Sequence, residues 1–144
     1  MAESHGVYVN GFRKMVDGTI SWGSDSIAAV LLSADYTPDP VEHETWGDVS
    51  TYMVSSPDHS PVLVANRAVS LDSSNRVVFT SSDISWGSDV DIAAHYCVFV
   101  RGDPADLTST DPLISLHDFG SVRESINSDF ALLAPSYWFR IQPA

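Results

Sequence analysis

Short apolar runs separated by turn-forming residues recur along the chain and predict strands. Residues 27–32 and 92–100 are apolar at almost every position, as is typical of strands buried on both faces. Residues 69–71 alternate between apolar and polar, and the chain returns along residues 76–80 after the turn-forming segment 72–75. This pattern predicts a hairpin. Two further short runs, 130–133 and 137–141, close the chain.

The pattern leaves little room for helix. Asp39, Pro40 and Glu42 are spaced like an N-cap, a first helical residue and a capping-box partner, which predicts one helical turn ending near Trp46. Asp17-Gly18 predicts a two-residue hairpin turn. Many short strands with turns about every 8–12 residues predict an all-β fold. We therefore expect an antiparallel β-sandwich, jelly-roll or immunoglobulin-like, with at most one short helical turn.

A chain of 144 residues is expected to form one domain. Residues 1–6 lack an apolar pattern and are predicted to be a flexible N-terminal arm. They also lack the basic and apolar regions of a signal peptide. Residues 7–144 are predicted to form a single β-sandwich domain.

One hexapeptide, Ile-Ser-Trp-Gly-Ser-Asp, occurs at residues 20–25 and again at residues 84–89. Glycine permits positive φ, and aspartate and serine bond their own backbone, so each copy predicts a turn. The copies are either one turn that arose twice by chance or two related corners that clamp one sandwich. In both interpretations Trp22 and Trp86 are structural residues, buried at strand ends where a large ring covers the core.

Acidic residues outnumber basic ones by 19 to 7, which gives a net charge of −12. Such a surface repels phosphate and therefore argues against nucleic-acid partners and against anionic membranes. It favours either solubility alone or docking on a basic protein patch. Arg13 and Lys14 are adjacent positive charges near the N-terminal arm, and we expect them to contact a partner subunit.

The sequence predicts no catalytic residue and no cofactor. His43 lies between Glu42 and Glu44, which permits a divalent-cation site. The spacing fits neither an EF-hand loop nor a His-Glu-x-x-His zinc helix, and it favours an exposed acidic turn without metal. No serine elbow, phosphate loop or zinc cysteine pair occurs, and the single cysteine, Cys97, is predicted to be buried. The other histidines have no sequence neighbours that suggest a triad: His5, His59, His95 and His117.

Three short motifs occur in a characteristic order: Ala-Asp-Tyr-Thr-Pro-Asp at residues 34–39, Pro-Leu-Ile at 112–114 and Asp-Phe-Gly at 118–120. With the two tryptophan phrases, they make the chain resemble a family of small virion structural proteins of tailed bacteriophages. The resemblance covers most of residues 7–142. It departs from the family at residues 52–61, where the family usually has a glycine-rich segment. The resemblance implies a β-rich head or tail component without catalysis.

The resemblance and the charge together lead us to expect a capsid decoration protein, made in the host cytoplasm and bound to the outer surface of the capsid. Packaged DNA would repel a chain of this charge, which favours the exterior. Its expected partners are the major capsid protein and copies of itself, with a trimer as the expected homo-oligomer. We expect neither a nucleic acid nor a membrane as partner.

A tail or fibre module that binds a host surface component is the alternative. In that case exposed aromatic residues would line a shallow site, and the candidates are Tyr36, Trp46 and Tyr52. A carbohydrate-active enzyme is a third hypothesis, but no carboxylate pair at a defined strand spacing supports it.

Overall fold

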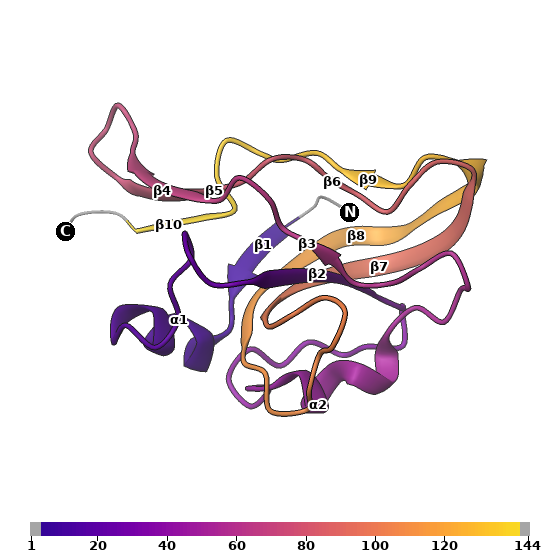
Figure 1. Ribbon diagram of the computed structural model, residues 1–144, viewed down its shortest axis with the longest axis horizontal. Coiled ribbons are helices and arrows are strands. Elements are labelled where there is room, and N and C mark those ends of the chain that lie inside the picture. The colour runs from indigo at the N-terminus through magenta and orange to yellow at the C-terminus, as the bar shows by residue number, and fades with distance from the viewer. Residues whose placement is uncertain (1–3, 142–144) are drawn as a thin grey trace.

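The computed structural model describes residues 4–141 and is built from antiparallel strands (Figure 1). A five-stranded sheet has the order β1-β8-β7-β2-β3, a second sheet has the order β10-β5-β4, and β6 pairs with β9. The strands are β1 (Ser4–Val7), β2 (Ile27–Leu32), β3 (Val62–Leu63), β4 (Ala68–Leu71), β5 (Val77–Thr80), β6 (Ile84–Ser85), β7 (Val90–Arg101), β8 (Leu113–Ser128), β9 (Ala131–Leu132) and β10 (Phe139–Ile141). The helices are α1 (Val9–Val16), α2 (Trp46–Val49) and the 3-10 turn η1 (Ser50–Tyr52).

The two apolar runs of the sequence lie side by side at the centre of the large sheet. β2 pairs with β7 from Ile27 opposite Arg101 to Leu32 opposite Tyr96. All six residues of β2 are fully buried, which confirms the prediction for residues 27–32. β7 alternates between buried and exposed residues at its start and becomes continuously buried where both faces are covered.

The sheets pack over two apolar layers. One layer lies between the large sheet and the two small ones, and it contains Trp22, Trp86, Phe79 and Trp138. The other lies on the opposite face of the large sheet, where the segment that carries α2 covers it. This packing confirms the predicted all-β, antiparallel, sandwich-like fold. The expected burial of both repeated tryptophans is also observed, at 2% and 7% exposure.

The prediction of at most one short helical turn is wrong, because residues 9–16 form α1. The apolar side chains of α1 recur at helical rather than strand spacing. Met15 packs against the core, and Phe12 is half-buried. Asp17-Gly18 ends this helix instead of forming a hairpin. The Asp17 amide donates to Arg13 and the Gly18 amide to Met15, and Gly18 has a φ of +87°.

The second helical segment also starts later than predicted. The Asp39 carboxylate accepts a hydrogen bond from the Glu42 amide, but no helix follows it there. α2 begins at Trp46 instead, where Thr45 and Asp48 form a reciprocal capping box.

The predicted N-terminal arm is in part a strand. Residues 1–3 lie outside the described range, and Ser4 to Gly6 belong to β1, which pairs antiparallel with β8. β8 itself runs through the polar segment 120–128, where its partner is the first half of β7. None of the helices among residues 4–141 is long and apolar enough to cross a membrane.

Candidate functional site

The sheet β10-β5-β4 carries an apolar face that extends beyond the core. The register places Val69, Phe79 and Phe139 in one row across the three strands. It places Leu71, Val77 and Ile141 in a second row, two residues further out. Residues two apart on a strand point to the same side, so all six side chains share one face. We call it the β4–β5–β10 face.

Phe79 and Phe139 of this face are anchored in the core, whereas Val69, Leu71 and Ile141 are exposed. The Phe79 and Phe139 rings stack at 4.5 Å, and both lie against Trp22, at 6.3 and 5.3 Å. Leu71 is 65% exposed and Ile141 is 40% exposed. The sheet therefore projects past the layer that supports it.

Helix α1 lies beside the projecting sheet and leaves a hollow between them. This hollow measures about 360 Å³, and apolar side chains from both elements line it, among them Phe12, Met15, Val16, Val69 and Ile141. A second hollow, of about 450 Å³, lies between β1, α1 and β10. The exposed apolar surface is therefore continuous from the hairpin to the helix.

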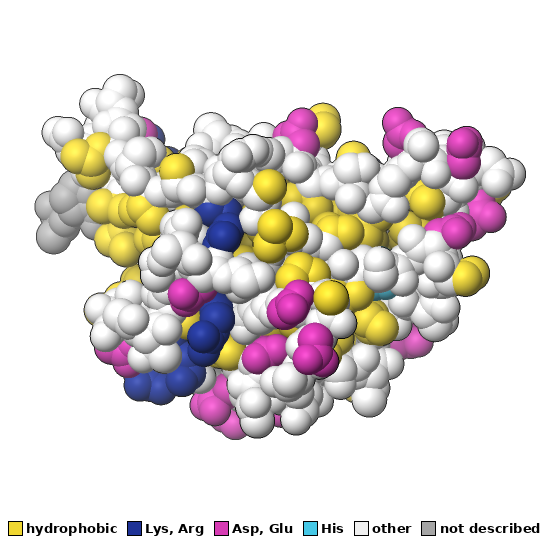
Figure 2. All heavy atoms as spheres, in the orientation of Figure 1, with side chains coloured by type: hydrophobic (Ala, Val, Ile, Leu, Met, Phe, Trp, Pro, Cys, Tyr) yellow, Lys and Arg dark blue, Asp and Glu magenta, His cyan; other side chains and the backbone are white. Residues whose placement is uncertain are grey.

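Five of the seven basic residues belong to the elements that form this end of the molecule or adjoin them. They are Arg13 and Lys14 in α1, Arg67 just before β4, Arg76 just before β5, and Arg140 in β10. In Figure 2 the dark-blue side chains lie in the half of the molecule that carries the β4–β5 hairpin. We call the β4–β5–β10 face with these five residues the basic end.

Several of these cations also hold the local structure. Arg76 pairs with Asp72 at 2.7 Å, and the Asp72 carboxylate accepts the amides of Ser74 and Arg76 in the hairpin turn. These bonds hold the pKa of Asp72 below its usual value. Arg67 donates to the Trp22 carbonyl at 2.8 Å, which ties the tryptophan turn to β4. Arg67 and Arg76 therefore hold the start of β4 and the β4–β5 turn in place.

The predicted contact residues divide into two groups. Arg13 is exposed and Lys14 is half-buried, and both lie at the basic end. Tyr36 and Trp46 are 2% and 7% exposed and belong to the core layer behind the large sheet. Their prediction as exposed contact residues is wrong, because the Tyr36 hydroxyl bonds Tyr8 and the ring packs inward. Tyr52 is half-buried against the same layer.

The acidic turn around His43 uses its polar groups for local structure. Asp48 accepts the amides of Glu44 and Thr45, and these bonds lower its pKa. The His43 ring shares a hydrogen bond with the Tyr36 hydroxyl. Over residues 4–141, no three His, Cys, Asp or Glu side chains gather in a way that could hold a metal ion.

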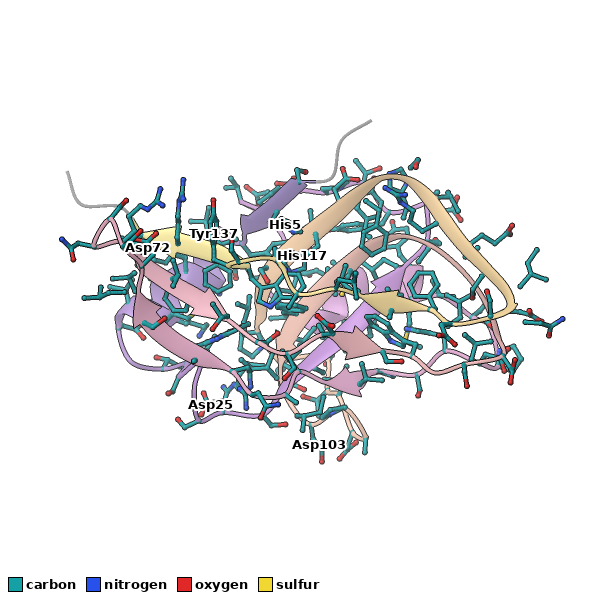
Figure 3. The ribbon with its side chains drawn as sticks, turned by 90° about the horizontal axis from the view of Figure 1, so that it is seen from above. His5, Asp25, Asp72, Asp103, His117 and Tyr137 are labelled. Carbon is teal, nitrogen blue, oxygen red and sulfur yellow. The ribbon has the colours of Figure 1, made fainter. Side chains whose placement is uncertain are left out.

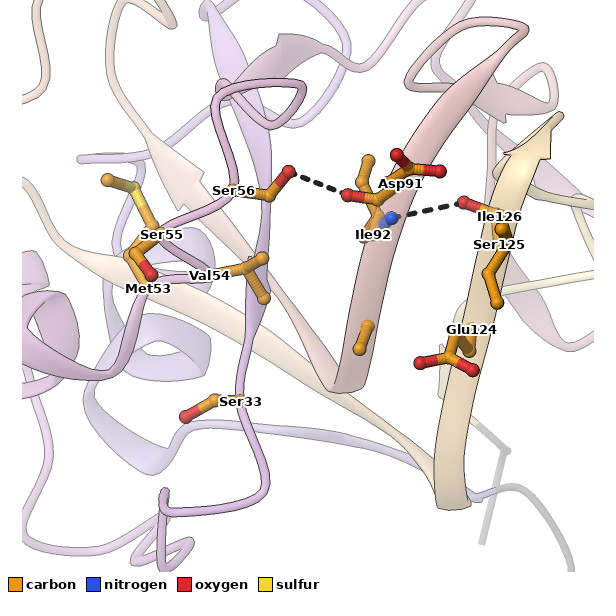
Figure 4. A pocket seen from close by; sticks show the side chains of 11 residues that line it. Ser33, Met53, Val54, Ser55, Ser56, Asp91, Ile92, Glu124, Ser125 and Ile126 are labelled. Carbon is orange, nitrogen blue, oxygen red and sulfur yellow. Dashed lines mark hydrogen bonds between the residues drawn. The ribbon is translucent and has the colours of Figure 1, made fainter.

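A third hollow lies away from the basic end, and Figure 4 shows it from close by. It measures about 420 Å³ and lies between the segment 53–56 and the start of the β7–β8 ladder. Asp91, Glu124, Met53 and Ile126 line it, and no lysine or arginine does. Ile126 is 69% exposed. We call it the acidic cleft.

A hydrogen-bonded row of polar side chains that local sequence does not reveal crosses β8 and β1. Ser115 Oγ lies 3.1 Å from His117 Nε2, and His117 Nδ1 lies 2.8 Å from His5 Nδ1. Figure 3 shows His5 and His117 next to each other. Burial, with the nearby His5, holds the pKa of His117 well below its usual value. Ser115 and His117 are fully buried, so the arrangement gives no substrate access to the serine.

Comparison with known proteins adds no relative: no family model, no curated protein and no solved structure matches this chain.

Proposed function

We propose that the chain is a non-catalytic structural protein of a bacteriophage virion that decorates the outer surface of the capsid and stabilises the head. The observation that carries this proposal is the β4–β5–β10 face, which exposes Val69, Leu71 and Ile141 at the basic end of an otherwise acidic protein. Contiguous exposed apolar surface of this kind marks contact with another protein.

The charge supports an external position. A chain with a net charge of −12 is repelled by packaged DNA, whereas a protein shell presents patches of either sign. The order of short motifs that resembles phage virion proteins supports the same setting. A decoration protein binds where several shell subunits meet, so individually weak contacts act together. We therefore propose the major capsid protein and further copies of this chain as its partners.

Sedimentation with purified virion parts tests the proposal. The protein is mixed separately with assembled bare capsid shells, with unassembled capsid subunits and with isolated tails. It should pellet with shells, remain free with subunits, and dissociate from shells as salt rises. Co-sedimentation with tails or host envelope, and not with shells, would favour the tail or fibre module instead.

A phage that lacks the gene gives a second test. Its particles should assemble but release DNA at a lower temperature than complete particles. The proposal would be overturned if particles that lack the gene were as heat-resistant as complete particles, and if the heads of complete particles did not contain the protein.

A further inference from the structure

We infer that copies of this chain join head to tail, with the basic end of one copy seated in the acidic cleft of the next. The inference names a second copy of this chain as the partner of the apolar face. It rests on the proposed function only in taking the protein to be part of an assembly. It does not depend on the shell being present, so it can be tested in solution.

The two surfaces match in chemical character. The basic end offers Leu71, Val69 and Ile141, which are 65%, 50% and 40% exposed. The acidic cleft offers Met53 and Ile126, which are 37% and 69% exposed. Removing either set of apolar side chains from water lowers the free energy, and no part of the described chain covers them.

The charges are complementary. Arg13, Lys14 and Arg140 belong to the elements of the basic end, and its five cations outnumber the two carboxylates paired with them in the described chain, Asp17 with Arg13 and Asp72 with Arg76. Asp91 and Glu124 lie on the wall of the cleft, with Asp58 bonded to the Asp91 amide beside them. Opposite potentials on two faces steer association and fix its register. Two basic ends facing each other, or two acidic clefts, would instead place like charges together.

Shape and position decide the geometry of the contact. The β4–β5 hairpin projects at one end of the long axis, and the start of the β7–β8 ladder lies at the other (Figure 1). Figure 3 also places Asp72, in the hairpin turn, at that first end. In the inferred contact the projecting hairpin of one copy enters the hollow of about 420 Å³ on the next. We call the β4–β5–β10 face the knob and the acidic cleft the socket. Because the surfaces differ, the contact is heterologous, and repetition gives a closed ring or an open chain.

Two single variants separate the two surfaces. Leu71→Asp places a carboxylate on the knob, and Ile126→Asp places one in the socket. Both wild-type side chains are exposed, so each variant should fold, which circular dichroism and urea unfolding verify. Leu133→Asp is the matched control, because Leu133 is 72% exposed and lines neither surface. Ile141→Asp provides a second knob variant.

Analytical ultracentrifugation over a concentration series gives the result. Wild type and Leu133→Asp should form oligomers that weaken as salt rises, and each knob or socket variant should weaken association about tenfold or more. An equimolar mixture of Leu71→Asp and Ile126→Asp should form dimers that go no further, because one intact knob meets one intact socket. Variants that dimerise alone, or a mixture that stays monomeric, would overturn the inference.

The shell assay separates this inference from the proposed function. A monomeric wild-type chain at millimolar concentration that still pellets with shells would refute head-to-tail joining and leave decoration intact. Oligomers of the expected kind that ignore shells would leave head-to-tail joining intact and refute decoration.

Discussion

Trp22 donates its indole N–H to the Thr80 carbonyl at 3.1 Å, whereas Trp86, at the same place in an identical hexapeptide, buries its indole nitrogen without a hydrogen-bond partner in the described chain. The two copies also differ in backbone, because Gly87 has a φ of +112° and no positive φ occurs at Gly23. Tertiary surroundings, and not the hexapeptide, therefore set the conformation of each tryptophan turn.

This difference predicts unequal costs for the same conservative change. Trp22→Phe removes a made hydrogen bond, and Trp86→Phe removes a buried donor that makes none, so the first should cost about 1 kcal/mol more. Full truncation to alanine should cost about 3–5 kcal/mol at either site. Urea unfolding of the four variants measures these values. Equal costs for the two phenylalanine variants would contradict the role of the Thr80 bond.

Gly11 sets how closely α1 packs on β8. A Cβ built on Gly11 would lie 2.1 Å from the Leu113 carbonyl oxygen, a distance that real atoms do not reach. Alanine usually stabilises a helix relative to glycine by about 1 kcal/mol, but Gly11→Ala should destabilise this protein because α1 must move away from the sheet. Gly23→Ala is the control, since nothing lies within 4 Å of its Cβ. A thermal melt of Gly11→Ala at or above wild type would show that α1 is free to shift.

Local pattern was enough to predict the elements whose signal is continuous. Residues 27–32 are apolar without interruption, and they form β2. The 69–71 and 76–80 alternation flanks a turn rich in Asp, Ser and Asn, and it forms the β4–β5 hairpin. α1 was missed because its helical spacing extends over only eight residues, and because Asn10-Gly11 within it and Asp17-Gly18 after it are typical of turns.

The candidate surfaces depend on contacts that no local pattern contains. The β4–β5–β10 face requires β10 to pair with β5 across some sixty residues of chain, and its exposure follows from how far the hairpin projects. His5 and His117 are separated by 112 positions and meet because β1 pairs with β8. Tyr36 and Trp46 are large aromatics in a polar segment, and only the tertiary packing shows that they cover a core layer.

The His59 side chain bridges the backbone of β2 and the segment that contains Val54. Its Nε2 accepts the Leu31 amide at 3.1 Å and its Nδ1–H donates to the Val54 carbonyl at 2.9 Å, so the ring must be neutral. Burial lowers its pKa below the ordinary 6.5, as burial also does for His117. The unfolded chain therefore binds these protons more readily, and stability is full above pH 6.5 and falls as the pH drops below it.

The variant His59→Gln isolates this effect. Glutamine can accept from Leu31 and donate to Val54 without titrating, so stability lost between about pH 7.5 and about pH 5.5 should be smaller in the variant than in wild type. Part of the pH dependence should remain, because His117 still titrates. Urea midpoints at both pH values provide the comparison, and identical losses in the two proteins would count against the neutral His59 bridge.

Calcium should leave the melting temperature unchanged. The Asp39 and Asp48 carboxylates already accept backbone amides, and His43 is bonded to Tyr36, so the acidic turn is organised by caps and not by an ion. A differential scanning measurement with and without millimolar calcium tests this directly. A rise in melting temperature that a chelator reverses would reveal a site that binds the folded state.

Cys97 should report opening of the whole sheet. It lies in β7, the central strand, opposite Leu31 of β2 on one side and His117 of β8 on the other. Burial raises the pKa of its thiol, and the thiolate is the reactive species. A thiol reagent at mildly alkaline pH should therefore modify the native protein at least about 10³-fold more slowly than the urea-unfolded chain, because both strands must separate before it can enter. Rates measured along a urea gradient should extrapolate to the global unfolding free energy. Rapid modification in native buffer, with the unfolding transition intact, would mean that β7 opens locally and that the centre of the large sheet is less stable than its packing indicates.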